Sequence, residues 1–162
     1  MEATIYQTLY EKRQQVLSQW QSAAFDAYGG NIALLRNKPE GRFSNPVVYL
    51  IEKATGEIFD LLIKPENDQI LTVSVNEICH LMAIQGSKPS RAISFIFALK
   101  QIIREELKDE NGANYWAAEM VEIDKIIDEI GLLAFDIYSD CRAEICDLKV
   151  SEIKRMYGRD AG

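Results

Sequence analysis

Side chains that bind transition metals are scarce in this sequence, which has one histidine, His80, and three cysteines, Cys79, Cys141 and Cys146. A zinc site takes three or four such ligands and no C-x-x-C pair is present, so no metal site is expected. An odd number of cysteines without a secretion signal predicts free thiols. We interpret all three as small core residues, with a redox role for Cys141 or Cys146 as the alternative.

Long apolar runs and positive charge are also lacking. No stretch approaches the roughly 20 apolar residues that span a bilayer, and the N-terminal residues lack the features of a signal peptide. Acidic residues outnumber basic ones by 25 to 18, which gives a formal net charge of −7. Because this charge is repelled by phosphate backbones and anionic lipid, we expect neither nucleic acid nor membrane as a partner, and a cytoplasmic location.

The residue groupings that mark enzymes are missing as well. The glycines form no phosphate-binding loop, and no serine lies in a nucleophile elbow. Cys79 and His80 are adjacent, so on a helix they point about 100° apart and cannot form a nucleophile–base pair. The many carboxylates fall on faces predicted to be solvated. The sequence therefore predicts no catalytic residues and no enzyme.

The residues present predict helices throughout. Apolar residues recur at spacings of three and four from 4 to 28, which indicates one helix ended by Gly29-Gly30. A short helical turn at 32–36 and a loop at 37–44 are expected to follow. Asn45-Pro46 is typical of a helix start, with Asn45 or the preceding Ser44 as the cap and Pro in the first turn. Gly56 lies within that helix, where it predicts close packing or a kink.

Two further helices are predicted in the middle of the chain. Ser74 to Glu77 has the S-x-x-E pattern of a capping box and predicts a helix start there, with Gly86 after its end. The next helix begins at 87–90, around Pro89. Its residues 92–107 are apolar on most sides, which predicts a central helix with Ile96 and Phe97 in the core.

A turn is expected at Asn111-Gly112, and helical periodicity resumes at about 114. It indicates either one helix of about 40 residues or two helices joined near Gly131 or Ser139. The last stretch is unusually polar, so residues 140–158 are expected to protrude as a partner contact. We predict one domain over 1–162, an all-α, globin-like or irregular bundle of about six helices.

Five polar residues are candidates for ligand binding. Asn45, Gln85, Ser90 and Arg91 lie at predicted helix junctions, where they either converge on a pocket or simply cap helix ends. The second interpretation is favoured. His80 is interpreted as a semi-buried structural residue, with an axial haem ligand or a pH-sensitive contact as alternatives.

Three stretches in order resemble the RsbRD N-terminal domain family, the N-terminal domain of RsbT co-antagonist proteins. They are Phe43-Ser44-Asn45-Pro46-Val47; Leu81 to Gln85 with Lys88 to Ala92 and Phe95 to Lys100; and Ala134 to Tyr138 with Arg142 and Glu152. The resemblance covers roughly Leu17 to Arg155. The sequence departs from the pattern at Met82, where the family usually has an arginine, which puts in doubt any anion contact made there.

This resemblance implies a sensory input domain of the globin-like, haem-free kind. No output domain follows in the sequence, so a stand-alone version is expected to signal by association. We therefore expect a non-catalytic regulatory module that binds a protein partner or a small molecule, and we expect it to form a homodimer through its first or last helix. The alternative is a globin-like cofactor protein with haem on His80, which requires His80 to face an apolar pocket.

Overall fold

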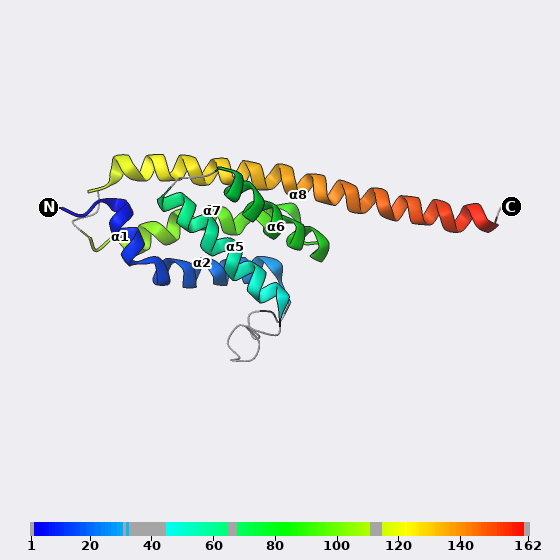
Figure 1. The fold of residues 1–162 in the computed structure, drawn as a ribbon, viewed down its shortest axis with the longest axis horizontal. Helices are drawn as coiled ribbons and strands as arrows, with labels where there is room; N and C mark the ends of the chain where they lie inside the picture. Colours follow the sequence, from blue (N-terminus) through cyan, green and yellow to red (C-terminus); the bar gives the residue numbers. More distant parts are fainter. Residues whose placement is uncertain (1, 31, 33–44, 65–67, 111–114, 161–162) are drawn as a thin grey trace.

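The computed structural model of the chain describes residues 2–30, 32, 45–64, 68–110 and 115–160. These residues form an all-α bundle, as the sequence predicts (Figure 1). Its six helices are α1 (Ile5–Glu11), α2 (Arg13–Tyr28), α5 (Pro46–Ile63), α6 (Asp68–Gln85), α7 (Pro89–Leu107) and α8 (Ala117–Asp160). The predicted loop at 37–44 and turn at 111–112 lie outside the described residues, as does the predicted helical turn after Ile32. The globin-like assignment stays a prediction.

The first predicted helix is in fact two, which corrects the expectation of one helix over 4–28. Thr4 caps α1: its hydroxyl accepts from the Gln7 backbone N–H, and the Gln7 side chain accepts from the Thr4 backbone N–H. The chain turns at Lys12 before α2 begins. Tertiary packing interrupts the helix although its apolar pattern is continuous. The turn lets α1 bury Ile5 and Leu9 while it contacts both α2 and α5.

The start of α5 is confirmed. Asn45 precedes Pro46, and its side-chain oxygen accepts from the Val47 backbone N–H at 3.0 Å. The close packing predicted at Gly56 is also present, since a Cβ there would lie 3.3 Å from Nη2 of Arg13.

The predicted helix start at Ser74 is wrong. Helix α6 begins at Asp68, so Ser74 lies inside the helix, where it is fully buried. Its hydroxyl donates to the carboxylate of Glu57 on α5 at 2.6 Å. The capping-box pattern arises because Ser74 faces a neighbouring helix rather than a free helix end. The end of α6 is as predicted, with Gly86 at a φ of 79°.

Helix α7 packs against α2 on one side and α8 on the other. Phe95, Ile96 and Leu99 are buried, and the indole N–H of Trp20 donates to the Phe95 carbonyl at 2.8 Å. Phe97 was expected in the core, but it is 37% exposed. Its ring lies against Gly131 on α8, at the edge of the α7–α8 contact.

Residues 117–160 form a single helix, without a break at Gly131 or Ser139. The first half of α8 lies along α6 and α7. From residue 146 to residue 158 its side chains are exposed, and the helix extends past the ends of the other helices in Figure 1. We call residues 146–158 the tail.

Candidate functional site

Four helix ends lie at the end of the bundle from which the tail extends. They are the C-terminal ends of α2 and α6 and the N-terminal ends of α5 and α7, with α2 and α5 on the side away from α8 (Figure 1). Ser87 donates to the Ala27 carbonyl at 3.3 Å, and Arg91 donates to the Asp26 carbonyl at 3.0 Å. These bonds fix the turn between α6 and α7 against the end of α2.

Two side chains of α8 hold the same turn. The Tyr138 hydroxyl donates to the Ser87 carbonyl, and Nη1 of Arg142 donates to the Ala83 carbonyl at 3.0 Å. Tyr138 is almost fully buried, and this burial raises its pKa, although the positive charge of Arg142 opposes the shift. We call these two contacts the exit clamp, because they bind the end of α6 and the α6–α7 turn to α8 at the point where the helix leaves the bundle.

Three of the candidate ligand residues, Gln85, Ser90 and Arg91, lie beside the α6–α7 turn, whereas Asn45 lies at the start of α5 and His80 lies further back on α6. Asn45 caps α5, while Gln85 ends α6 and Ser90 lies in the first turn of α7; the last two are exposed. A shallow cavity of about 360 Å³ at this junction is lined by Arg91 and by none of the other four. Of the five candidates, Arg91 therefore contributes to this cavity, and a pocket shared by the others stays a prediction.

His80 is exposed, which corrects the expectation of a semi-buried residue. Its Nδ1 lies 2.9 Å from the Asn76 carbonyl, one turn earlier in the same helix. The side chain therefore does not face the apolar core around Phe95, Ile96 and Leu99, as an axial haem ligand would have to.

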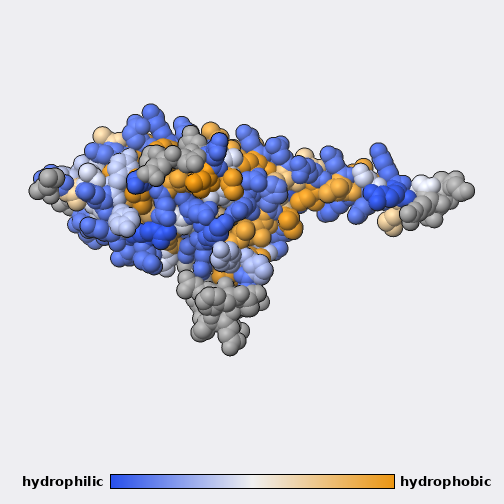
Figure 2. Space-filling view, viewed as in Figure 1, coloured by the Kyte–Doolittle hydropathy of each residue, from blue (hydrophilic) through white to orange (hydrophobic). Residues whose placement is uncertain are grey.

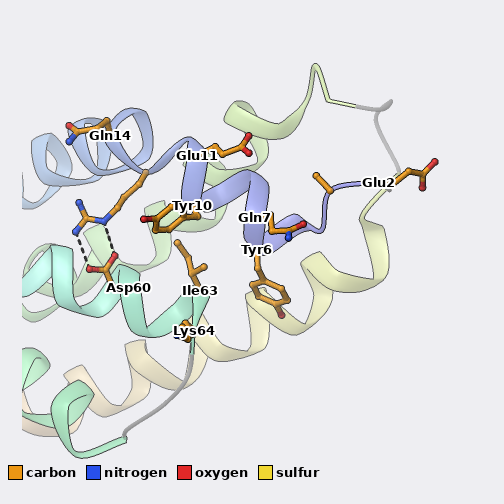
Figure 3. Close-up of a pocket in the computed structure, with 11 residues that line it drawn as sticks. Glu2, Tyr6, Gln7, Tyr10, Glu11, Gln14, Asp60, Ile63 and Lys64 are labelled. Atoms are coloured by element: carbon orange, nitrogen blue, oxygen red, sulfur yellow. Dashed lines mark hydrogen bonds and ion pairs between the residues drawn. The ribbon is translucent and has the colours of Figure 1, made fainter.

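A larger cavity lies at the opposite ends of α2 and α5, and the sequence analysis did not identify it. It measures about 1150 Å³ and is lined by residues of α1, the start of α2 and the end of α5 (Figure 3). Across it, Arg13 donates to Asp60 through Nε at 2.7 Å and through Nη2 at 3.0 Å. Hydrogen bonding to Asp60 raises the pKa of Arg13. Tyr6 and Tyr10 add aromatic surface.

This cavity was missed because it depends on the turn at Lys12. That turn swings α1 over the end of α5, and the sequence pattern predicts a straight helix instead. Arg13 and Asp60 are 47 residues apart, so their spacing carries no local signal. Paired charges beside two tyrosines can offer a small polar ligand both hydrogen bonds and ring contacts.

Two cysteines lie inside the bundle, at the α6–α8 contact. Cys79 and Cys141 are both buried, and the Cys79 thiol donates to the Ala134 carbonyl at 3.6 Å. Burial, with a smaller contribution from Cys141, raises the pKa of Cys79 to about 12. Cys146, by contrast, is exposed at the start of the tail. A thiol like Cys79 stays protonated and unreactive at neutral pH.

Within the described ranges, no three histidine, cysteine, aspartate or glutamate side chains are grouped so that they could hold a metal ion. Among the described helices, none is long and apolar enough to cross a membrane.

The fold and the exit clamp define an all-α domain built around one long C-terminal helix. The sequence model of the RsbT co-antagonist protein RsbRD N-terminal domain matches residues 14–149, which are most of the chain. The chain belongs to this family, which confirms the resemblance seen in the sequence. At the level of the family, it is a sensory or regulatory input domain. Neither a curated protein nor a solved structure matches it.

Proposed function

We propose that the chain is a non-catalytic sensory module that acts by binding a protein partner or a small ligand. In this proposal residues 1–162 act as one domain, and the tail, which is the protruding part of the predicted segment 140–158, carries the output. The observation that supports it is the exit clamp. Tyr138 and Arg142 tie the α6–α7 turn to a helix that continues, unbroken, into the tail.

The clamp provides a physical route for a signal. A helix responds as a rigid element, so a shift of α6 or α7 at the turn is passed to the tail only if the turn and α8 move together. Ligand or partner contact at the α6–α7 turn, beside Gln85, Ser90 and Arg91, would act on the clamp directly, and contact at Asn45 would act through α5. Contact in the cavity beside Arg13 and Asp60 would act through α2 and α5.

The test uses the tagged full chain to capture partners from its native host, with the native mass and absorbance spectrum of the same material. We expect a stoichiometric protein partner with the wild type and less of it with Arg142→Gln, because that variant removes the bond from α8 to the Ala83 carbonyl near the end of α6, one of the two contacts of the exit clamp. The matched control is Arg104→Gln. Arg104 also bonds to α8, through Oδ1 of Asp124 at 3.0 Å, but at the other end of the bundle.

Three outcomes would contradict the proposal. One is the absence of any partner or ligand, and another is an equal loss of partner with Arg104→Gln. The third is coloured material with a haem absorbance band that His80→Ala removes, which would make the chain a cofactor protein.

A further inference from the structure

One wall of the large cavity at the start of α2 and the end of α5 is aromatic. Helix α1 buries Ile5 and Leu9 against the bundle and leaves Tyr6 and Tyr10 exposed by 36% and 70%. The two tyrosines are four residues apart, so they lie on the same face of α1, and both line the cavity. Figure 3 shows Tyr10 beside the ion pair that crosses the cavity and Tyr6 further along α1. Neither ring belongs to the buried core, so both are accessible to a ligand.

The charges that line this cavity are negative on balance. Its lining contains the carboxylates Glu2, Glu11 and Asp60 and the cations Arg13 and Lys64. Because Arg13 donates two hydrogen bonds to Asp60, these two charges offset each other, and two carboxylates remain against one lysine. The cavity also lies at the C-terminal end of α5, where a helix carries partial negative charge. The lining therefore favours a positively charged ligand over an anion.

The protein surface next to the cavity is acidic as well. Lys12, at the turn between α1 and α2, pairs with Glu110 at 3.3 Å, so the residues that follow α7 lie next to this turn. Residues 105–110 carry four carboxylates and one lysine. Figure 2 shows that the surface at this end of the bundle is largely hydrophilic. A surface with this excess of negative charge concentrates cations near the cavity and repels anions.

We propose that this cavity binds a small organic cation, an amine or quaternary ammonium compound with an apolar body. The ring faces of Tyr6 and Tyr10 attract the cationic group, because the face of an aromatic ring carries partial negative charge. Glu2 and Glu11 supply the negative potential, and Ile63 offers the apolar body a hydrophobic contact. This combination of rings, carboxylates and one apolar wall is not matched by an equal set of anion-binding groups.

A ligand in this cavity can also act on α8. The Tyr115 hydroxyl donates to the carboxylate of Glu2, and Tyr115 lies two residues before α8 begins. A bound cation competes with this hydrogen bond for Glu2, so the start of α8 responds to the cavity while the exit clamp holds the same helix further along. The proposal rests on the proposed function, for which it names the class of ligand.

The experiment is a titration of the full chain, followed by two-dimensional NMR, with aromatic probes of different charge: benzyltrimethylammonium, benzyl alcohol and phenylacetate. We expect benzyltrimethylammonium to bind with a dissociation constant of about 1 mM or below and to shift the amide signals of α1 most. The neutral and anionic probes should bind at least about 10-fold more weakly. Raising the salt concentration from about 0.05 to about 0.5 M should weaken binding of the cation.

Substitutions then test the site. Tyr10→Leu keeps an apolar side chain but removes the ring, so it should weaken binding of the cation at least about 5-fold, whereas Tyr10→Phe should stay within about 2-fold of the wild type. Asp60→Asn leaves the charge of Arg13 uncompensated, so it should weaken binding of the cation and strengthen binding of phenylacetate. All of these variants should fold, because the substituted side chains are exposed, and circular dichroism checks this.

Tyr49→Leu is the matched control. Tyr49 is also an exposed tyrosine, but it lies near the start of α5, at the end of that helix away from the cavity, so its loss should leave the dissociation constant unchanged. An equal loss of affinity with Tyr49→Leu would overturn the proposal, as would an affinity for the cation that Tyr10→Leu leaves unchanged. Phenylacetate that binds as tightly as the cation would also overturn it, as would no binding of any probe up to about 20 mM. Partner capture that still depends on Arg142 would in those cases leave the proposed function standing, with a protein partner in place of this ligand.

Discussion

The contact between Gly131 of α8 and Phe97 of α7 gives a sharp test of how these two helices pack. A Cβ built at Gly131 would lie 2.3 Å from Cζ and 2.6 Å from Cε1 of Phe97, closer than real Cβ atoms approach. Gly131→Ala therefore forces the ring to move. Because Phe97 is 37% exposed, the ring can swing outward, at the cost of its packing on α8.

Two opposing effects set the magnitude. Replacing glycine by alanine inside a helix stabilises it by about 1 kcal/mol, whereas overpacking costs about 1–3 kcal/mol. With Phe97 present, Gly131→Ala should thus lower the free energy of unfolding by about 0–2 kcal/mol. In a Phe97→Ala background the ring is absent, so the same change should raise it by about 1 kcal/mol. The sign of the effect reverses.

The assay is urea unfolding of the four proteins of this double-mutant cycle, followed by far-UV circular dichroism. The coupling energy should be about 1–3 kcal/mol. Gly158→Ala serves as the control, because no atom lies within 4 Å of a Cβ there; its effect should be the same in both backgrounds. If Gly131→Ala stabilises the protein equally with and without Phe97, the contact does not exist as described and α8 packs on α7 differently.

Four other predictions concern the core and the cysteines. Trp20→Phe should lower the free energy of unfolding by about 1–2 kcal/mol in urea, because it removes the buried bond to the Phe95 carbonyl. Ile96→Ala should cost about 2–5 kcal/mol, and a loss below about 1 kcal/mol would show that α7 is peripheral. Cys146 should react rapidly with a thiol reagent in the native protein while Cys79 does not. Because the pKa of the Cys79 thiol is raised in the folded state, the unfolded chain loses the thiol proton at lower pH than the folded chain does. The free energy of unfolding should therefore be unaffected by this group below about pH 9 and should fall between pH 9 and about 12. A Cys79→Ala variant should lose less stability over that range.

The sequence predicted the elements whose signals are local. Asn45-Pro46 and Gly86 mark helix boundaries through backbone geometry and capping, and the structure has boundaries at both places. The length of α8 followed from its periodicity, although periodicity alone did not exclude a break. Helix class and approximate extent are properties of a short window of sequence, so they can be obtained without the fold.

The wrong predictions concern features that are set by contacts between residues far apart in the sequence. The S-x-x-E pattern at Ser74 predicted a helix start because the position of Glu57 on α5 is invisible in the local sequence. The turn at Lys12 and the cavity beside Asp60 depend on packing across 47 residues. His80 and Phe97 were placed too deep, because a periodic pattern gives the apolar face of a helix but not where its edge lies.

The tail raises a question of helix stability that the bundle does not. Helices are stabilised chiefly by packing of an apolar face, and an isolated helix of this length is marginal in water. The tail has no such packing within the chain, and it contains β-branched residues at Val150 and Ile153 and a glycine at 158, all unfavourable in an isolated helix. Its apolar residues Val150, Ile153 and Tyr157 recur at helical spacing and are at least half exposed, and a helix with such an uncovered apolar face gains stability when another molecule packs on it. A contact on the tail would therefore stabilise the same helix that the exit clamp holds. Binding at one end and the state of the bundle at the other would be linked through α8.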